Sequence, residues 1–293
     1  MKYARIQNGA HIRVAAISDD GNSYTTKIID GKEFSGDMRA WISETGGGPD
    51  PAIDSASENW APLDDIRLLA PIIPPRNVFC VGKNYRTHAR EFEKSGFDTS
   101  SKAGEEIPPF PVVFTKAPTS IIGDGDDIVS HASLTTQLDY EAELAVVIGV
   151  RGKHISRANA WSHVYGYTIV NDVTARDFQQ RHRQWFLGKS MDTFCPMGPW
   201  IARASSIKPE EMAIRCHVNG ELRQDSSPAH LIFDIPALIE TISAGIELLP
   251  GDVIATGTPA GVGIGFDPPR FLRPGDRISI SISGIGTLSN SVS

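Results

Sequence analysis

Two glutamates, Glu141 and Glu143, stand two residues apart where a strongly apolar run of strand-type residues begins. Side chains alternate between the two faces of a strand, so both carboxylates should point to the same face. A second apolar run, 165–170, leads to Asp172, which adds a third carboxylate at a strand end. Carboxylates buried together repel each other unless a cation lies between them. Oxygen ligands without a nearby cysteine or histidine favour Mg²⁺ or Mn²⁺ over Zn²⁺.

The competing interpretation of these carboxylates is a half-exposed strand with an acidic surface. Residues 144–150 are apolar on both faces, which predicts a central, buried strand and therefore favours the metal site.

A histidine and a glutamate three residues apart, His88 and Glu91, follow a predicted strand at 77–81 and fall in a predicted helix at 84–93. This spacing places them on one helix face, within reach of each other. A carboxylate bonded to imidazole fixes its tautomer and raises its basicity, which suits general-base activation of water. A surface pair on a helix is the alternative.

Two further segments have residues that suit ligand binding. Lys189 follows a glycine in an apolar loop, which indicates close approach to a ligand, although a plain surface turn has the same pattern. The glycine-rich stretch 256–263 follows a predicted strand and includes Gly257 and Thr258. Its backbone N–H groups could hold a carboxylate or an oxyanion, but it lacks the ending of a nucleotide-binding P-loop. A simple turn is again the alternative.

Composition limits the class of protein. The chain has 293 residues, 40% hydrophobic and 22% charged, with a net charge of −7, as in an ordinary globular protein. No block of basic residues favours nucleic acid or an anionic membrane as a partner. The cysteines, Cys80, Cys195 and Cys216, match no zinc or redox spacing and are expected to be reduced and buried. With no signal-peptide core and no bilayer-length apolar run, we expect a cytoplasmic protein.

The order of predicted elements indicates a strand-rich α+β fold. Residues 1–70 form a small N-terminal domain with short strands, and a proline-rich connector near residue 70 precedes a larger domain, 71–293. The larger domain lacks the regular alternation of a doubly wound sheet. Helices are predicted at 84–93, 156–164 and 236–245. The polar stretch 94–109 is a candidate lid, and we expect residues 84–106 to close over a bound ligand.

Five motifs together resemble the fumarylacetoacetate hydrolase family over residues 75–292. They are GKNYRTH at 82–88, LDYEAEL at 138–144, NDVTARD at 171–177, GKS at 188–190 with GP at 198–199, and TGTP at 256–259. The resemblance implies the family's mixed β-sandwich roll and a homodimer. The first 70 residues resemble the small N-terminal segment of some members more loosely.

The resemblance also assigns roles to residues. Glu141, Glu143 and Asp172 match the family's metal ligands, and His88 with Glu91 matches the dyad of its shorter, acylpyruvase-like members. The remaining matches are catalytic Lys189 and the substrate-contacting Arg86, Gln179, Gly257 and Thr258.

The implied activity is a Mg²⁺- or Mn²⁺-dependent hydrolase that cleaves a C–C bond in an acylpyruvate or related diketo acid through an enolate. The same site would suit an oxaloacetate decarboxylase, a hydroxymuconate-type isomerase or a hydrolase of diketo-deoxy sugar acids. A non-catalytic dicarboxylate-binding protein is the alternative of another class.

Overall fold

The computed structural model describes residues 1–29, 32–49, 51, 53, 60–64, 66–94 and 108–293. The greater part of the predicted lid, 95–107, lies outside the described residues. Within the described part of the chain, no helix is both long and apolar enough to cross a membrane.

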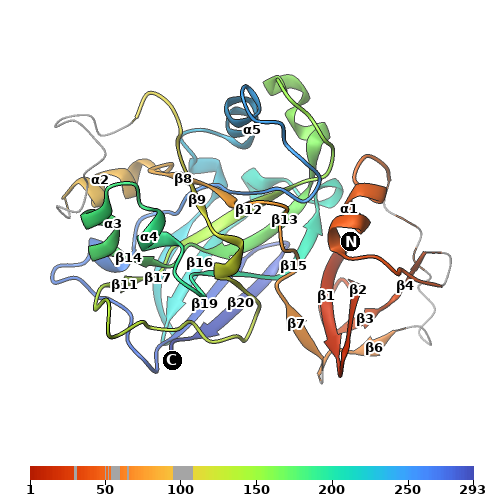
Figure 1. Cartoon of the computed structure of the whole chain (residues 1–293), viewed down its shortest axis with the longest axis horizontal. Helices are drawn as coiled ribbons and strands as arrows, with labels where there is room; N and C mark the ends of the chain where they lie inside the picture. Colours follow the sequence, from red (N-terminus) through yellow and green to blue (C-terminus); the bar gives the residue numbers. More distant parts are fainter. Residues whose placement is uncertain (30–31, 50, 52, 54–59, 65, 95–107) are drawn as a thin grey trace.

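One large mixed sheet organises the molecule (Figure 1). Its strands follow the order β6-β3-β2-β1-β15-β13-β12-β18-β8-β9, with β7 paired to β1 and β10 to β15. The bounds are β1 Lys2–Asn8, β2 His11–Ile17, β3 Ser23–Thr25, β6 Ala61–Pro62, β7 Arg67–Leu69, β8 Val78–Gly82, β9 Val112–Lys116, β10 Ile121–Ile122, β12 Ala142–Ile148, β13 Val164–Asn171, β15 Cys195–Arg203 and β18 Val253–Ala255.

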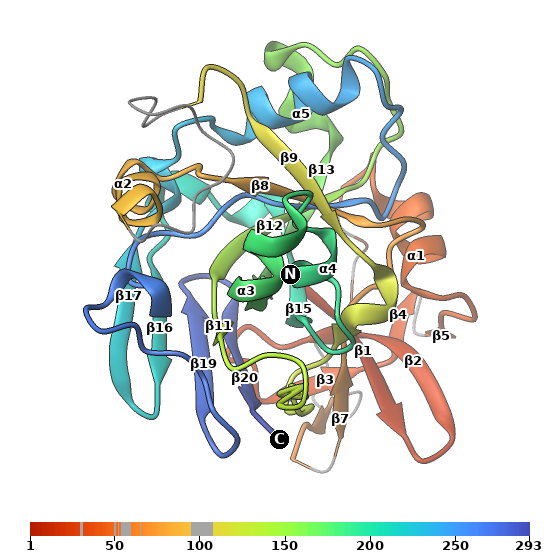
Figure 2. The same ribbon diagram turned by 60° about the vertical axis from the view of Figure 1, so that its left-hand side comes forward.

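A four-stranded sheet with the order β17-β16-β19-β20 lies on the side of the molecule opposite α5 (Figure 2). Its strands are β16 Ile214–Val218, β17 Glu221–Ser226, β19 Arg277–Ile282 and β20 Gly286–Ser291. Two small ribbons pair β4 Lys27–Ile29 with β5 Lys32–Glu33, and β11 Leu138–Asp139 with β14 Thr174–Ala175. The α-helices are α1 Met38–Thr45, α2 Arg86–Lys94, α3 Arg176–His182, α4 Phe186–Lys189 and α5 Ile235–Ser243.

Strand β12 is central, as its apolar sequence predicts, and every residue in it is buried. It pairs with β13 on one side and β18 on the other. Leu144 and Val146 pack into one hydrophobic cluster, while Ala145 and Val147 pack into a second one. Because side chains alternate along a strand, Glu143 lies on the face of the second cluster.

The strand-rich fold class is confirmed, and the three free cysteines are buried as expected. Helices predicted at 84–93 and 236–245 are present as α2 and α5. The helix predicted at 156–164 is a 3₁₀ helix, Arg157–His163, whose backbone bonds join residues three apart, as from the Asn159 amide to the Ser156 carbonyl (3.0 Å). The strand predicted at 200–202 is longer, because β15 pairs with β13 and β1.

Strands of both predicted domains belong to the same large sheet. Strand β1 of the N-terminal segment pairs with β15, with Lys2 opposite Ala202 and Tyr3 opposite Ile201. In Figure 1 the N-terminal elements, in red and orange, lie beside β15 on the right. The boundary at residue 70 stays a prediction.

The central position of β18 gives a first prediction. Ile254 is 0% exposed and packs into the same hydrophobic cluster as Leu144. Ile254→Ala should therefore lower the free energy of unfolding by about 2–5 kcal/mol. Ile246→Ala is the control, because Ile246 is 44% exposed and its truncation should change stability by less than about 0.5 kcal/mol. Urea unfolding measures both, and equal effects would contradict this account of the core.

Candidate active site

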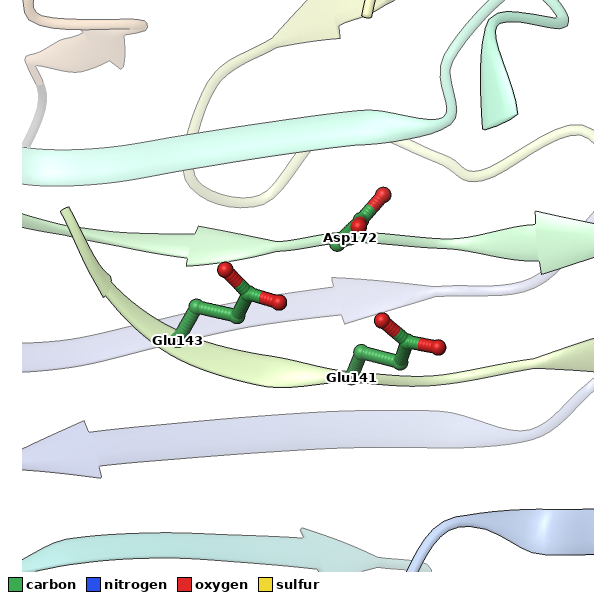
Figure 3. A group of neighbouring side chains, drawn as sticks. All are labelled: Glu141, Glu143 and Asp172. Carbon is green, nitrogen blue, oxygen red and sulfur yellow. The ribbon is translucent and has the colours of Figure 1, made fainter. Parts of the chain in front are cut away.

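The three predicted carboxylates lie together. One oxygen from each of Glu141, Glu143 and Asp172 falls within 4.8 Å of the others, and all three side chains are buried. Figure 3 shows Glu141 and Glu143 on the same side of one strand, next to Asp172 on the neighbouring one. The strand ends are tied by the Glu141 amide, which donates to Asn171 Oδ1 (3.0 Å), and by the Asp172 amide, which donates to the Glu141 carbonyl (2.9 Å).

Buried cations neutralise two of the carboxylates. Lys189 Nζ donates to Glu141 Oε2 and Asp172 Oδ2, both at 2.8 Å. Lys116 Nζ donates to Asp172 Oδ1 at 2.6 Å, and Arg176 Nη1 lies 2.7 Å from Glu141 Oε1. Burial acts to raise the pKa of Glu141, but Lys189 and Arg176 outweigh it and lower that pKa to about 2.

Glu143 is different because, among the described residues, its side chain accepts from a backbone amide, that of Gly257, at 2.8 Å. Burial, and then the charges of Asp172 and Glu141, raise the pKa of Glu143 well above its usual value. Among the described residues, no cation forms an ion pair with Glu143, in contrast to Glu141 and Asp172. A buried set of three carboxylates, one of them without a cationic partner among the described residues, fits a divalent cation that prefers oxygen, such as Mg²⁺ or Mn²⁺.

The predicted dyad is formed and borders the same site. His88 Nδ1 lies 3.1 Å from Glu91 Oε2, and the Gly261 amide donates to Glu91 Oε1 at 2.9 Å. His88 and Phe92 lie on the buried face of α2. The helix start is fixed by Asn84, whose side chain bonds the backbone of Phe233 and the Thr256 carbonyl. The alternative interpretation, a surface pair on a helix, is wrong because His88 is 5% exposed.

A small cavity lies between two carboxylates of the triad and the histidine of the dyad. His88, Glu141, Glu143 and Lys189 contribute to its lining. The other residues that line it are Val81, Gly82, Lys83, Phe92, Phe114, Arg176, Gln179, Trp185 and Thr258. The wall thus combines two carboxylates, three cationic side chains and aromatic rings, which suits a metal-bound small anion.

The predicted substrate residues are not all in this cavity. Gln179 and Thr258 line it, while Gly257 bonds Glu143 through its amide. The Arg86 side chain is exposed and does not contribute to the lining, because it lies on the outer face of α2. Gln179 is oriented by Arg176, whose Nη1 donates to Gln179 Oε1 at 3.1 Å.

Sequence reasoning missed two cations that hold the site. Arg176 is 1% exposed and also donates from Nε to Asp139 Oδ2 at 2.9 Å. Arg176 belongs to the NDVTARD motif and Asp139 to the LDYEAEL motif, so a contact between the two motifs could have been predicted from the sequence. Lys116 is 0% exposed at the end of β9, where a lysine closing an apolar strand was the sole hint.

Comparisons with known proteins agree with this geometry. The chain belongs to the fumarylacetoacetate hydrolase family, because residues 77–293 match the model described as "Fumarylacetoacetate (FAA) hydrolase C-terminal". It is 56% identical over 232 residues to the oxaloacetate tautomerase YisK of Bacillus subtilis, covering 78% of this chain and 74% of that protein.

Solved structures show the same family resemblance. A fumarylacetoacetate hydrolase from Exiguobacterium antarcticum is 43% identical with a TM-score of 0.85, covering 100% of this chain and 99% of that one. A 5-carboxymethyl-2-hydroxymuconate delta-isomerase from Mycobacterium smegmatis is 37% identical with a TM-score of 0.76, covering 100% and 99%.

The triad gives the second prediction. Glu143→Gln should weaken Mn²⁺ binding by more than about 100-fold, because loss of an outer partner of a ligand alone costs about 10- to 100-fold. Isothermal titration of the metal-stripped protein measures the affinity without reference to activity. Glu247→Gln, which removes an exposed carboxylate, is the control and should bind Mn²⁺ as the parent does. Unchanged affinity in Glu143→Gln would exclude this carboxylate as a ligand.

Proposed function

We propose that this chain is a metal-assisted tautomerase that interconverts the enol and keto forms of a short α-keto dicarboxylate such as oxaloacetate. One observation supports it above the others. His88, which is paired with Glu91 and can hold and release a proton, lines the same small cavity as Glu141 and Glu143 of the triad. Enol–keto interconversion requires only that one proton leave the enol oxygen and one arrive at the neighbouring carbon.

The relative named as an oxaloacetate tautomerase supports this choice of substrate, at 56% identity. The cavity supports it as well, because Lys83, Arg176 and Lys189 contribute positive charge to its wall. A dicarboxylate would find charge-assisted hydrogen-bond donors there.

Each group of this chain has a separate task. A bound Mg²⁺ or Mn²⁺ would supply Lewis-acid polarisation of the keto oxygen and stabilise enolate charge. Glu91 accepts the Nδ1–H of His88, which leaves Nε2 of the imidazole as the base for the substrate proton. Lys189 and Arg176 hold Glu141 in place and bring positive charge to the developing oxyanion. Phe92, Phe114 and Trp185 give the cavity an apolar, aromatic wall.

Cleavage of a C–C bond in an acylpyruvate is the second candidate function. It is favoured by the same His88–Glu91 pair, which is arranged as a general base for water. One structural relative carries the name fumarylacetoacetate hydrolase. Decarboxylation, hydroxymuconate-type isomerisation and hydrolysis of diketo-deoxy sugar acids pass through related enolates and belong in the same substrate panel. Non-catalytic binding of a dicarboxylate would leave the buried dyad without a role. The homodimer and the cytoplasmic location stay predictions.

The dyad gives the third prediction. With Mg²⁺ present, the protein should accelerate oxaloacetate enol–keto interconversion, followed by the ultraviolet absorbance of the enol. His88→Ala should slow it by about 10²- to 10⁴-fold, the usual contribution of a positioned acid or base. Glu247→Gln again serves as the exposed control.

Release of pyruvate from acylpyruvates, measured in parallel, separates the two candidates. If the parent protein releases pyruvate and leaves oxaloacetate unchanged, hydrolysis replaces tautomerisation as the proposed function. If His88→Ala matches the parent in both assays, the dyad has no part in either reaction.

The cationic wall gives the fourth prediction. Lys83 is buried, and its Nζ lies 5.6 Å from the centre of the Phe92 ring in the cavity wall. Lys83→Met keeps the bulk and removes the charge, so kcat/KM for oxaloacetate should fall by about 10- to 100-fold, as expected for one charge-assisted hydrogen bond. Lys94→Met, at an exposed lysine on α2, is the control. An equal loss with an acylpyruvate that has an uncharged tail would contradict recognition of the second carboxylate.

A further inference from the structure

A single glycine-rich segment, residues 257–265, holds three carboxylates of the site through its backbone. The Gly257 amide donates to Glu143, and the Gly261 amide donates to Glu91 at 2.9 Å. The Gly263 amide donates to Asp139, the partner of Arg176, at 2.6 Å. We call this segment the glycine loop. It therefore contacts the metal triad, the dyad and the anchor of the buried arginine.

The glycine loop helps to hold the Glu91 carboxylate beside His88, although this carboxylate also borders a second cleft. Its two oxygens are occupied by His88 and by the Gly261 amide. On its other side lies an outer cleft, whose lining includes Glu91 itself, Arg90, Lys94 and Gly265. The lining of that cleft also includes Asp267, so its charge is mixed. A displaced Glu91 carboxylate could reach Lys94, which is three residues further along the same helix.

Gly265 leaves the space that Glu91 occupies. A Cβ atom on Gly265 would lie 1.8 Å from Glu91 Oε1 and 2.2 Å from Glu91 Cδ, which no pair of atoms tolerates. The backbone of Gly265 itself is not in the left-handed region, so an alanine there meets no conformational strain. Gly261 differs, because its φ is +102° and its Cβ would lie 1.9 Å from the Arg223 carbonyl oxygen.

We propose that Gly265 is a positioning residue for acid–base catalysis: its missing side chain keeps the Glu91 carboxylate between the Gly261 amide and His88. This inference rests on the proposed role of the dyad. A side chain at position 265 would displace the carboxylate from its place between the Gly261 amide and His88. His88 would then lose the partner that fixes its tautomer, while the triad and the cavity wall would keep their contacts.

The test is a double-mutant cycle of Gly265→Ala and Glu91→Ala. Gly265→Ala should lower kcat for oxaloacetate interconversion by about 10- to 100-fold, since a misplacement of about 1 Å can cost 10²-fold. The dissociation constants of Mn²⁺ and of oxalate should stay within about 2-fold, because neither site is touched. In the Glu91→Ala background, Gly265→Ala should cause no further loss. Gly245→Ala is the matched control, because a Cβ there meets nothing within 4 Å.

The outcomes separate the inference from the proposed function. Full activity in Glu91→Ala would refute the dyad's role, whatever Gly265→Ala does. Loss of activity in Glu91→Ala with none in Gly265→Ala, or losses that add in the double variant, would overturn the positioning role alone. If Gly265→Ala does not fold, the double variant decides: its folding supports a clash with Glu91, and its failure to fold places the clash elsewhere.

Discussion

The structure depends on the burial of three carboxylates at the ends of two central strands, Glu141, Glu143 and Asp172, and of a fourth, Asp139, on β11. Ions are costly to remove from water unless opposite charges and hydrogen bonds compensate them. Lys116, Lys189 and Arg176 meet part of that requirement, and backbone amides of the glycine loop meet more of it. No described cation pairs with Glu143, which accepts a hydrogen bond from the Gly257 amide, so the triad could hold one more cation. A protein with complete neutralisation here would be easier to fold and less able to bind metal.

This requirement explains why remote parts of the chain converge. The Lys116 ammonium and Asp172 are 56 residues apart, and the Gly257 amide and Glu143 are 114 apart. The cations come from β9, α3 and α4, and each pairs with a carboxylate just before β12 or just after β13. Short elements such as α4 are stable there because their charged groups are satisfied by the buried carboxylates. The same contacts that make the fold specific also leave a small cavity between them.

Local patterns in the sequence were sufficient for the features carried by one element. Alternation along β12 predicted the direction of its two glutamates, and helical spacing predicted contact between His88 and Glu91. Motif resemblance joined these pieces. It assigned Arg86 to substrate binding, whereas the Arg86 side chain is exposed on α2. A motif says which residues recur and not which face of the helix each residue occupies. The role of Lys116 arises from contacts across the sheet, which no local pattern records. The glycine-rich pattern predicted amides that hold a carboxylate, but it did not identify the protein's own carboxylates as their partners.

The alternation of β12 between two apolar clusters has a consequence for the folding reaction itself. If β12 paired with its neighbours one residue out of register, every side chain would change face. Its buried glutamate would then enter the apolar cluster around Leu144, remote from its partners, at a cost of several kcal/mol. The acidic residues thus raise the free energy of sheets with a shifted register during folding. The same charge that the site uses in the folded protein therefore favours the native alignment of β12 as the sheet forms.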